Sequence, residues 1–126
     1  MNKIETNQAP EAIGPYSQAI ETGNTLYISG QIPLVPETML FNSDDVALQT
    51  EQCLKNLLAI LTAASYSFND VVKCTIFLID MNDFNAVNDI YAHFFNTHQP
   101  ARACVEVSRL PRDAKVEIEA IAVKTN

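Results

Sequence analysis

Two alternating segments joined by a proline turn close the chain, and they constrain its fold more than any other feature. The first begins at Pro100 and ends at Val107, the second spans 116–123, and the turn Leu110-Pro111-Arg112-Asp113 lies between them. Apolar and polar side chains alternate in both segments, which is typical of β-strands. We therefore predict two strands here.

The two predicted strands carry charged side chains on defined faces. In the first, Arg102, Cys104 and Glu106 share one face. In the second, one face is apolar, and the other begins with Glu117 and Glu119 and ends with apolar side chains. We expect part of this second face to be covered, and another subunit is a candidate for the cover. An arginine and a glutamate held on rigid strands can bind a small anion and act on it.

The remaining segments predict an α+β fold in one domain covering residues 1–126. Leucines at 54, 57, 58 and 61 form a stripe that faces a core. The polar N-terminal start is expected to be loose. Hairpin and βαβ steps mix along the chain, so we expect a mixed sheet with both helices on one face and self-association covering the other. Strands are predicted at 16–20, 25–32, 38–41 and 71–79, and helices at 45–64 and from the caps at 80–83 to 94 or 95.

Composition excludes several classes of function. Fifteen acidic and eight basic residues give a net charge of −7, which argues against nucleic acid and against an anionic membrane surface. Cys53, Cys74 and Cys104 show neither zinc spacing nor a disulfide framework, so reduced thiols in a cytoplasmic protein are expected. His93 and His98 lack metal-ligand spacing. The chain has three glycines and no phosphate-binding loop, so we expect no nucleotide cofactor, and we expect no metal either. It contains no long apolar run, so we expect no membrane segment.

Arg102 and Glu117 are the main candidates for chemistry, although most strand arginines and glutamates are simply solvated. Arg102 follows Pro100 and precedes an apolar run, so partial burial is expected, and a carboxylate fits a guanidinium bidentately. Partial desolvation would raise the pKa of Glu117 and suit it to proton transfer. Glu119 competes with it for that role. Cys104 is either a nucleophile without an evident base or a small wall residue.

The spacing of Arg102 and Glu117 creates a geometric difficulty. In a simple hairpin turning near Arg112, Glu117 lies opposite about Val107, which is roughly 17 Å along the strand from Arg102. The two side chains can meet only if the strands are not hairpin partners or if they belong to different chains. This favours a site at a subunit boundary. Separately, Gly30 inside a predicted strand marks either a bulge or a close approach to the backbone.

Several motifs follow one another along the chain in a characteristic order. They are Ala12-Ile13-Gly14-Pro15-Tyr16-Ser17-Gln18-Ala19, Ser29-Gly30-Gln31-Ile32-Pro33, the middle segments 71–78 and 81–84 with Val87-Asn88, Pro100-Ala101-Arg102 to Val107, Leu110-Pro111, and Val116 to Ala122. With these motifs the chain resembles the Rid family, also called YjgF-like, and most of all its RidA subgroup of 2-iminobutanoate/2-iminopropanoate deaminases. The resemblance runs over nearly the whole chain, and its C-terminal motif is the most specific.

This resemblance implies a chorismate-mutase-like α+β fold, a homotrimer and clefts between its subunits. It implies hydrolysis of 2-aminoacrylate and related enamines or imines to 2-keto acids and ammonia, which removes reactive intermediates of pyridoxal-phosphate enzymes. No cofactor is implied. Two other functions stay open: a trimer that binds a metabolite or a protein without turnover, and an RNA-acting translation inhibitor, which the acidic charge disfavours.

The resemblance also assigns roles to single residues. Arg102 holds the substrate carboxylate, helped by the backbone N–H groups of Gly30 and Cys104, and Glu117 orients or activates water. Tyr16 closes the pocket, which Ser29 and Asn88 line. Two positions depart from the family pattern, because Met39 and Ser65 stand where relatives often have glycine, and this puts loop geometry in question more than catalysis.

Overall fold

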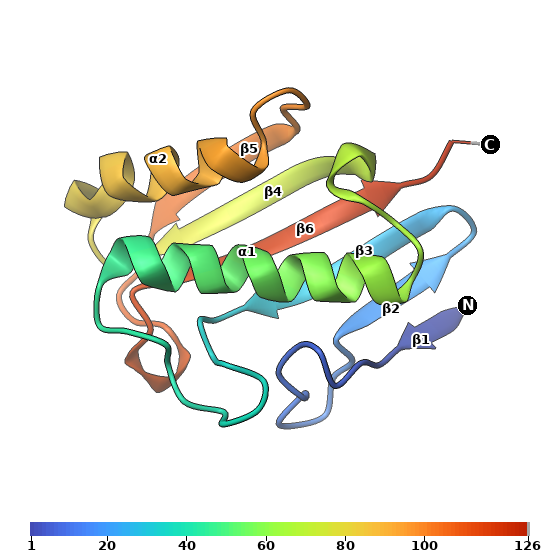
Figure 1. Cartoon of the computed structure of the whole chain (residues 1–126), viewed down its shortest axis with the longest axis horizontal. Coiled ribbons are helices and arrows are strands. Elements are labelled where there is room, and N and C mark those ends of the chain that lie inside the picture. The colour runs from blue at the N-terminus through green and yellow to red at the C-terminus, as the bar shows by residue number, and fades with distance from the viewer. Residues whose placement is uncertain (126) are drawn as a thin grey trace.

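Six strands form one sheet in the order β1-β2-β3-β6-β4-β5, and both helices lie on one of its faces (Figure 1). The computed structural model describes residues 1–125. Its elements are β1 (Asn2–Ile4), β2 (Ala19–Thr22), β3 (Thr25–Gln31), α1 (Val46–Ala63), β4 (Val71–Leu78), α2 (Phe84–Phe94), β5 (Ala101–Glu106) and β6 (Val116–Val123), with short 3₁₀ turns η1 (Phe68–Asp70), η2 (Met81–Asp83) and η3 (Pro111–Asp113).

The strand directions confirm the predicted α+β arrangement. β4 and β5 run parallel, and every other pair in the sheet is antiparallel. The parallel pair is joined through α2, as a βαβ unit requires. The sheet is therefore mixed, with the two helices packed on the same side of it (Figure 1).

Helix α1 follows the leucine stripe that predicted it. Its N-cap is Asp45, whose carboxylate accepts a hydrogen bond from the Leu48 backbone N–H at 3.0 Å. Leu54, Leu57 and Leu61 are fully buried against the sheet. The helix ends at Ala63, two residues before Ser65 adopts a positive φ of 64°. Cap and end agree with the prediction to within one residue, but Leu58, predicted on the buried stripe, is 39% exposed.

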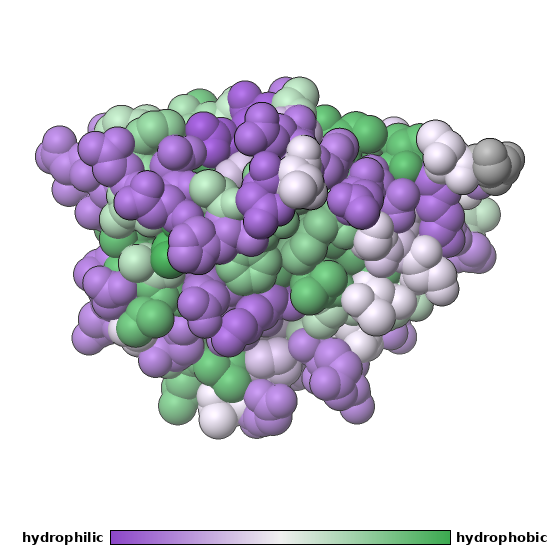
Figure 2. Space-filling model, turned by 45° about the horizontal axis from the view of Figure 1, so that its top comes forward, coloured by the Kyte–Doolittle hydropathy of each residue, from purple (hydrophilic) through white to green (hydrophobic). Residues whose placement is uncertain are grey.

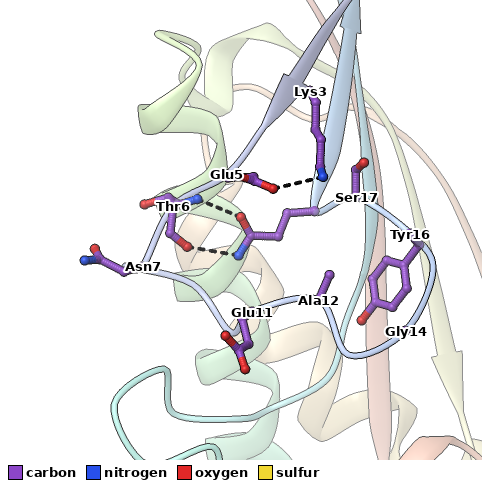
Figure 3. Close-up of a pocket in the computed structure, with 10 residues that line it drawn as sticks. Lys3, Glu5, Thr6, Asn7, Glu11, Ala12, Gly14, Tyr16 and Ser17 are labelled. Carbon is purple, nitrogen blue, oxygen red and sulfur yellow. Dashed lines mark hydrogen bonds and ion pairs between the residues drawn. The ribbon is translucent and has the colours of Figure 1, made fainter.

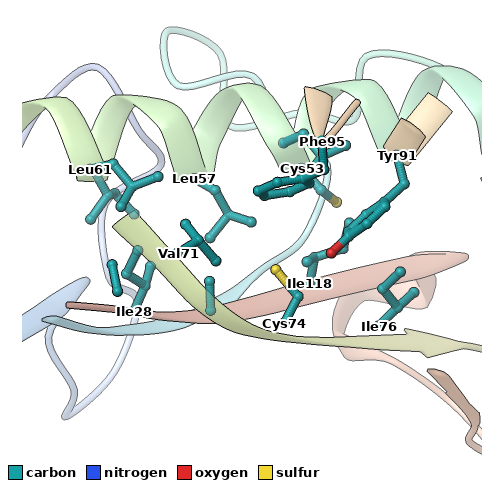
Figure 4. Close-up of a cluster of buried hydrophobic side chains, with 14 of the residues drawn as sticks. Ile28, Cys53, Leu57, Leu61, Val71, Cys74, Ile76, Tyr91, Phe95 and Ile118 are labelled. Carbon is teal, nitrogen blue, oxygen red and sulfur yellow. The ribbon is translucent and has the colours of Figure 1, made fainter. Parts of the chain in front are cut away.

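The core lies between the helices and the inner face of the sheet (Figure 4). Cys53 from α1 and Cys74 from β4 are both fully buried in it, which confirms that they are packing residues. Burial raises the pKa of both thiols, so they stay protonated. Ile76 and Ile118 complete the sheet side, next to Tyr91 from α2 (Figure 4).

Three predictions near the N-terminal half were wrong. The start of the chain is not loose, because residues 2–4 form an edge strand that pairs with β2, Lys3 lying opposite Ile20. The strand predicted at 16–20 begins three residues later, so Tyr16 lies in a loop. The strand predicted at 38–41 reduces to one bridge between Leu34 and Phe41, since the positive φ of Met39 interrupts extended backbone there.

Helices cover one face of the sheet, and the other face is open. On the helix side, hydrophilic side chains cover most of the surface and hydrophobic ones form smaller patches between them (Figure 2). The other face of the sheet carries no helix among residues 1–125 (Figure 1). Tyr27 pairs with Ile121 on this open face, and Phe77 pairs with Val105 and Glu117. Tyr27 and Val105 are 50% and 41% exposed, so the open face has an apolar surface.

Within residues 1–125, neither α1 nor α2 is both long enough and apolar enough to span a lipid bilayer.

Candidate active site

Arg102 and Glu117 lie on opposite faces of the sheet. Strand β4 separates β5 from β6, so the two C-terminal strands are not hairpin partners. Arg102 aligns with Cys74, which points into the core, whereas Glu117 aligns with Phe77 on the open face. Side chains that alternate along a strand point to alternate faces. The two residues therefore do not meet within one chain.

Helix α2 contacts one side of Arg102, which is exposed, so the predicted partial burial of this residue was wrong. The Nη1 atom of Arg102 donates a hydrogen bond of 2.7 Å to Oδ1 of Asn88. The guanidinium carbon lies 4.9 Å from the centre of the Tyr91 ring and 5.6 Å from that of Phe84. Arg102, Asn88 and Tyr91 line one open hollow together with Pro100. Asn88, predicted to line the pocket, thus contacts the predicted carboxylate anchor directly.

Cys104 shares the helix-side face with Arg102 and is half-buried. Burial raises the pKa of its thiol, and the nearby Arg102 charge opposes that rise without cancelling it. A thiol with a raised pKa is a poor nucleophile at neutral pH. Of the two readings of Cys104, this geometry favours the small wall residue.

Glu117 lies against the backbone of Gly30. A Cβ atom added at Gly30 would lie 2.8 Å from the carboxylate carbon of Glu117 and 3.1 Å from its Cγ, which is closer than packed atoms allow. The register of β3 against β6 also shifts between Ile28 and Gln31. The bulge predicted at Gly30 is therefore present, and the group that approaches its backbone is the side chain of Glu117, whereas the sequence interpretation named a ligand in that place.

The surroundings of Glu117 favour its protonated form. Burial raises the pKa of its carboxyl group, and the charge of Glu119 on the same face raises it further. Glu119 is exposed, whereas Glu117 is half-buried. Burial thus distinguishes the two competitors and favours Glu117 as the candidate for proton transfer.

Tyr16 lies in the loop before β2, and Ser29 lies in β3, which pairs with β2. The hydroxyl of Ser29 donates a hydrogen bond of 2.6 Å to the carbonyl oxygen of Ser17. Tyr16 is 52% exposed and lines a hollow of about 200 Å³ together with Gly30. The predicted site residues consequently form two groups: Arg102, Asn88 and Cys104 around α2 and β5, and Tyr16, Ser29, Gly30 and Glu117 around β3 and β6.

Gln18 is a residue that sequence reasoning missed. Its buried side-chain amide accepts a hydrogen bond from the Thr6 N–H at 2.8 Å and donates to the carbonyl oxygens of Thr6 and Pro10 at 3.0 and 2.8 Å. Gln18 lines a polar hollow, and Figure 3 shows Thr6 and Tyr16 lining the same hollow. The Gln18 amide fixes the loop that carries Tyr16. An amide directly after Tyr16-Ser17 was the available signal.

Within residues 1–125, no group of three or more His, Cys, Asp or Glu side chains is placed to hold a metal ion. His98 instead has a hydrogen-bond partner in the backbone, because its Nε2 lies 2.6 Å from the carbonyl oxygen of Val71. His93 is exposed on α2.

Comparison with known proteins assigns the chain to a family. Residues 6–124 match the family model described as endoribonuclease L-PSP, so the chain belongs to this family, which is the YjgF/Rid family. Its six-stranded α+β fold is the YjgF fold, as solved relatives show. A crystal structure from Thermotoga maritima is 48% identical, with a TM-score of 0.98 over 100% of this chain and 99% of that one.

Other relatives carry names that bear on function. The chain is 56% identical to a RutC family protein of Pyrococcus horikoshii, over 96% of both chains. It is 48% identical to the "Putative reactive intermediate deaminase TdcF" of Escherichia coli, over 97% of this chain and 96% of the relative. The structure of that protein with bound serine has a TM-score of 0.95 at 46% identity, over 99% and 100% of the two chains. RidA from an Antarctic Psychrobacter species gives 0.95 at 44% identity, over 98% and 100%.

Proposed function

We propose that this protein is an imine and enamine deaminase of the RidA type. It hydrolyses 2-imino acids, and enamines such as 2-aminoacrylate after tautomerisation, to 2-keto acids and ammonia. The observation that carries this proposal is Glu117, a half-buried carboxyl group with a raised pKa on a rigid strand, close to Gly30. The names given to relatives, including TdcF and RidA, support the same class of reaction.

The site is formed by two chains of a homotrimer. Arg102 and Glu117 point away from opposite faces of one sheet, so a cleft containing both needs Arg102, Asn88 and Cys104 from one chain and the Glu117 group from its neighbour. The apolar surface of the open face, which includes Tyr27, supports self-association.

Arg102 binds the carboxylate of the substrate. A guanidinium has five N–H donors, and the bond to Asn88 uses one of them, so a bidentate contact with a carboxylate is still available. The backbone N–H groups of Cys104 and of the neighbour's Gly30 add donors to the same carboxylate. Tyr16 closes the pocket, and Ser29 lines it beside Gly30.

Glu117 moves the protons of the hydrolysis. As a carboxylate it takes a proton from a water molecule, whose oxygen bonds to the C2 carbon of the protonated imine and gives a carbinolamine. The protonated Glu117 then gives that proton to the nitrogen and becomes a carboxylate again. The C–N bond breaks with its electron pair leaving on ammonia, and the C2 hydroxyl group passes its proton to the ammonia through Glu117 as the keto group forms. The net reaction converts one protonated imine and one water into one keto acid and one ammonium ion, and it restores the Glu117 carboxylate. General acid–base catalysis of this kind contributes about 10²- to 10⁴-fold.

A coupled assay tests the proposal. A serine or threonine dehydratase generates the imine in place, and keto-acid release is followed with the parent protein, Arg102→Ala and Glu117→Gln. We expect the parent to accelerate release and each variant to lose most of the acceleration, about 10²-fold or more for Arg102→Ala because two charge-assisted hydrogen bonds are lost. Arg109→Ala, an exposed arginine paired with Asp113, is the matched control. A parent that leaves the rate unchanged with both dehydratases contradicts the proposal.

A second function has one observation in its favour. The solved TdcF structure holds serine, so binding of an amino acid without turnover is the alternative for this chain. In the same experiment, serine or 2-oxobutanoate binding that depends on Arg102, combined with no effect on imine lifetime, would identify a metabolite-binding protein. For the RNA activity that the family description names, retention of RNA that weakens steeply with salt is the discriminating measurement.

A further inference from the structure

One stripe of helix α2 faces the guanidinium of Arg102. Phe84, Asn88 and Tyr91 follow one another at spacings of four and three residues, which places them on the same side of a helix. The neutral side chain of Asn88 accepts the hydrogen bond from Nη1 at 2.7 Å. The ring centres of Phe84 and Tyr91 lie 5.6 and 4.9 Å from the guanidinium carbon. About two turns of the helix therefore supply three contacts to one cation.

Tyr91 is held firmly enough to act as a support. Its side chain is 6% exposed, and its ring lies 4.8 Å from that of Phe95 at an interplanar angle of 34°. Figure 4 shows the ring directed into the core, with its hydroxyl group near Cys74. That hydroxyl is buried, and the Cys74 thiol is its neighbour. The same ring also contacts Arg102, whose guanidinium carbon lies 4.9 Å from the ring centre.

We propose that Tyr91, assisted by Phe84, is a positioning residue that orients the Arg102 guanidinium for carboxylate binding. An arginine side chain has many rotamers, and ordering them on binding weakens affinity. The attraction between a cation and a ring face restricts the guanidinium before substrate arrives. The hydrogen bond to Asn88 fixes the rotation of the guanidinium plane about the end of the Arg102 side chain. This inference rests on the proposed function, because it assigns a role in binding the substrate carboxylate.

The proposal separates binding from chemistry. Tyr91 acts on the ground-state contact with the carboxylate, so its loss raises KM and the Kd for a carboxylate ligand and changes kcat less. A cation–π contact predicts an effect of roughly 2- to 30-fold on Kd. Because Tyr91 acts through Arg102, its effect disappears when Arg102 is absent.

A double-mutant cycle tests this. Tyr91→Leu, which removes the ring face, is made in the parent and in Arg102→Ala, and Kd for 2-oxobutanoate is measured by calorimetry beside KM and kcat in the coupled assay. We expect Tyr91→Leu to raise Kd and KM about 10-fold in the parent and to leave both unchanged in Arg102→Ala. Tyr91→Phe, which keeps the ring, is expected to restore most of the affinity. Equal losses in both backgrounds would overturn the proposal, since they indicate a structural role.

Controls keep the outcome interpretable. Phe94→Leu removes an aromatic ring of α2 that packs on Phe68 at 5.8 Å, so it is expected to lower stability without changing Kd. If Tyr91→Leu does not fold, Phe84→Leu tests the second ring and is expected to raise Kd by about 2- to 5-fold. Parent protein that binds 2-oxobutanoate without hydrolysing imines would overturn the proposed reaction alone. Parent protein that binds no 2-oxobutanoate would overturn the role of Tyr91 as well.

Discussion

The α2–β5 edge and the β3–β6 centre of the sheet treat their charged side chains in opposite ways. At the edge, Arg102 is exposed, and it contacts the side-chain amide of Asn88 and the rings of Phe84 and Tyr91. At the centre, Glu117 is half-buried against Gly30, where burial and the charge of Glu119 disfavour its charged form. One region keeps a cation ready for an anion, and the other keeps a carboxyl group ready to exchange a proton.

The difference teaches why neither region is a site by itself. A cation without a proton-transfer group binds an anionic metabolite but does not hydrolyse it, and a carboxyl group without an anchor does not hold its substrate. Since the two regions project from opposite faces of one sheet, joining them requires a second chain. The following predictions are ordered from the largest expected effect to the smallest.

Replacing Glu117 has the largest expected effect. Glu117→Gln is expected to lower kcat by about 10²- to 10⁴-fold, because the side chain no longer takes a proton from water. Binding of 2-oxobutanoate, which depends on Arg102, is expected to change little. Steady-state kinetics and calorimetry on the same preparation separate the two. Loss of binding with kcat preserved would reverse the roles assigned to the two regions.

The same variant is expected to change stability with a defined pH dependence. The pKa of Glu117 lies above its unfolded value of 4.5, so the folded protein holds this proton to higher pH and ionisation weakens folding. That penalty is absent below about pH 4.5 and is complete above the folded pKa. Thermal unfolding should therefore show Glu117→Gln more stable than the parent at neutral pH and equal to it at about pH 4. A constant difference at all pH values would contradict the assigned pKa direction.

Gly30→Ala tests the contact between the strand backbone and Glu117. The added methyl group would lie 2.8 Å from the Glu117 carboxylate carbon and must displace it, and a shift of about 1 Å at a catalytic group costs about 10²-fold in rate. Gly23→Ala is the matched control, because a Cβ there meets nothing within 4 Å and only its φ of 58° is unfavourable. It should reduce stability and leave kcat unchanged. An unaffected kcat in Gly30→Ala would remove Gly30 from the account.

Glu119→Gln should move a pH profile without abolishing activity. Removing the Glu119 charge removes one cause of the raised pKa of Glu117, so the pKa of Glu117 falls. Activity that requires the Glu117 carboxylate is lost as pH decreases through that pKa, and this acidic limb should therefore move to lower pH. The profile of kcat/KM against pH measures the shift. If the acidic limb moved to higher pH in Glu119→Gln, or if it persisted unchanged in Glu117→Gln, the limb would not report the pKa of Glu117.

Ser65→Gly and Met39→Gly test loop geometry and have the smallest expected effect. Both residues adopt left-handed backbone, with φ of 64° and 59°, at positions where the family resemblance predicts glycine. Relief of left-handed strain exceeds the added chain entropy, so each change should stabilise by about 0.5–1 kcal/mol. Urea unfolding measures this, with Ala64→Gly, at φ of −97°, expected to destabilise. Activity should be unchanged.

The sequence was most informative where structure is local. The leucine stripe of α1, the apolar run of β4 and the alternation of β6 were each readable from periodicity. Gly30 was readable as a special position, because a glycine inside a strand needs a reason. The glycine positions of relatives anticipated the left-handed residues Met39 and Ser65.

The sequence was least informative about contacts between distant segments. The insertion of β4 between β5 and β6 depends on pairings far apart in the chain, and the hairpin assumption gave a wrong neighbour for Glu117. Residues 2–4 are too short and too polar to signal a strand, and they become one by pairing with β2. The roles of Gln18 and Tyr91 depend on partners that no local pattern identifies.

Subunit complementation tests most directly whether two chains share the site. Arg102→Ala and Glu117→Gln chains are unfolded, mixed in equal amounts and refolded, and the keto-acid release of the mixture is compared with that of each variant refolded alone. A shared cleft predicts recovery of about a quarter of the parent activity, because random assembly restores both native residues in about one cleft of four. A mixture no more active than the two variants alone would contradict a site that takes Arg102 from one chain and Glu117 from the next.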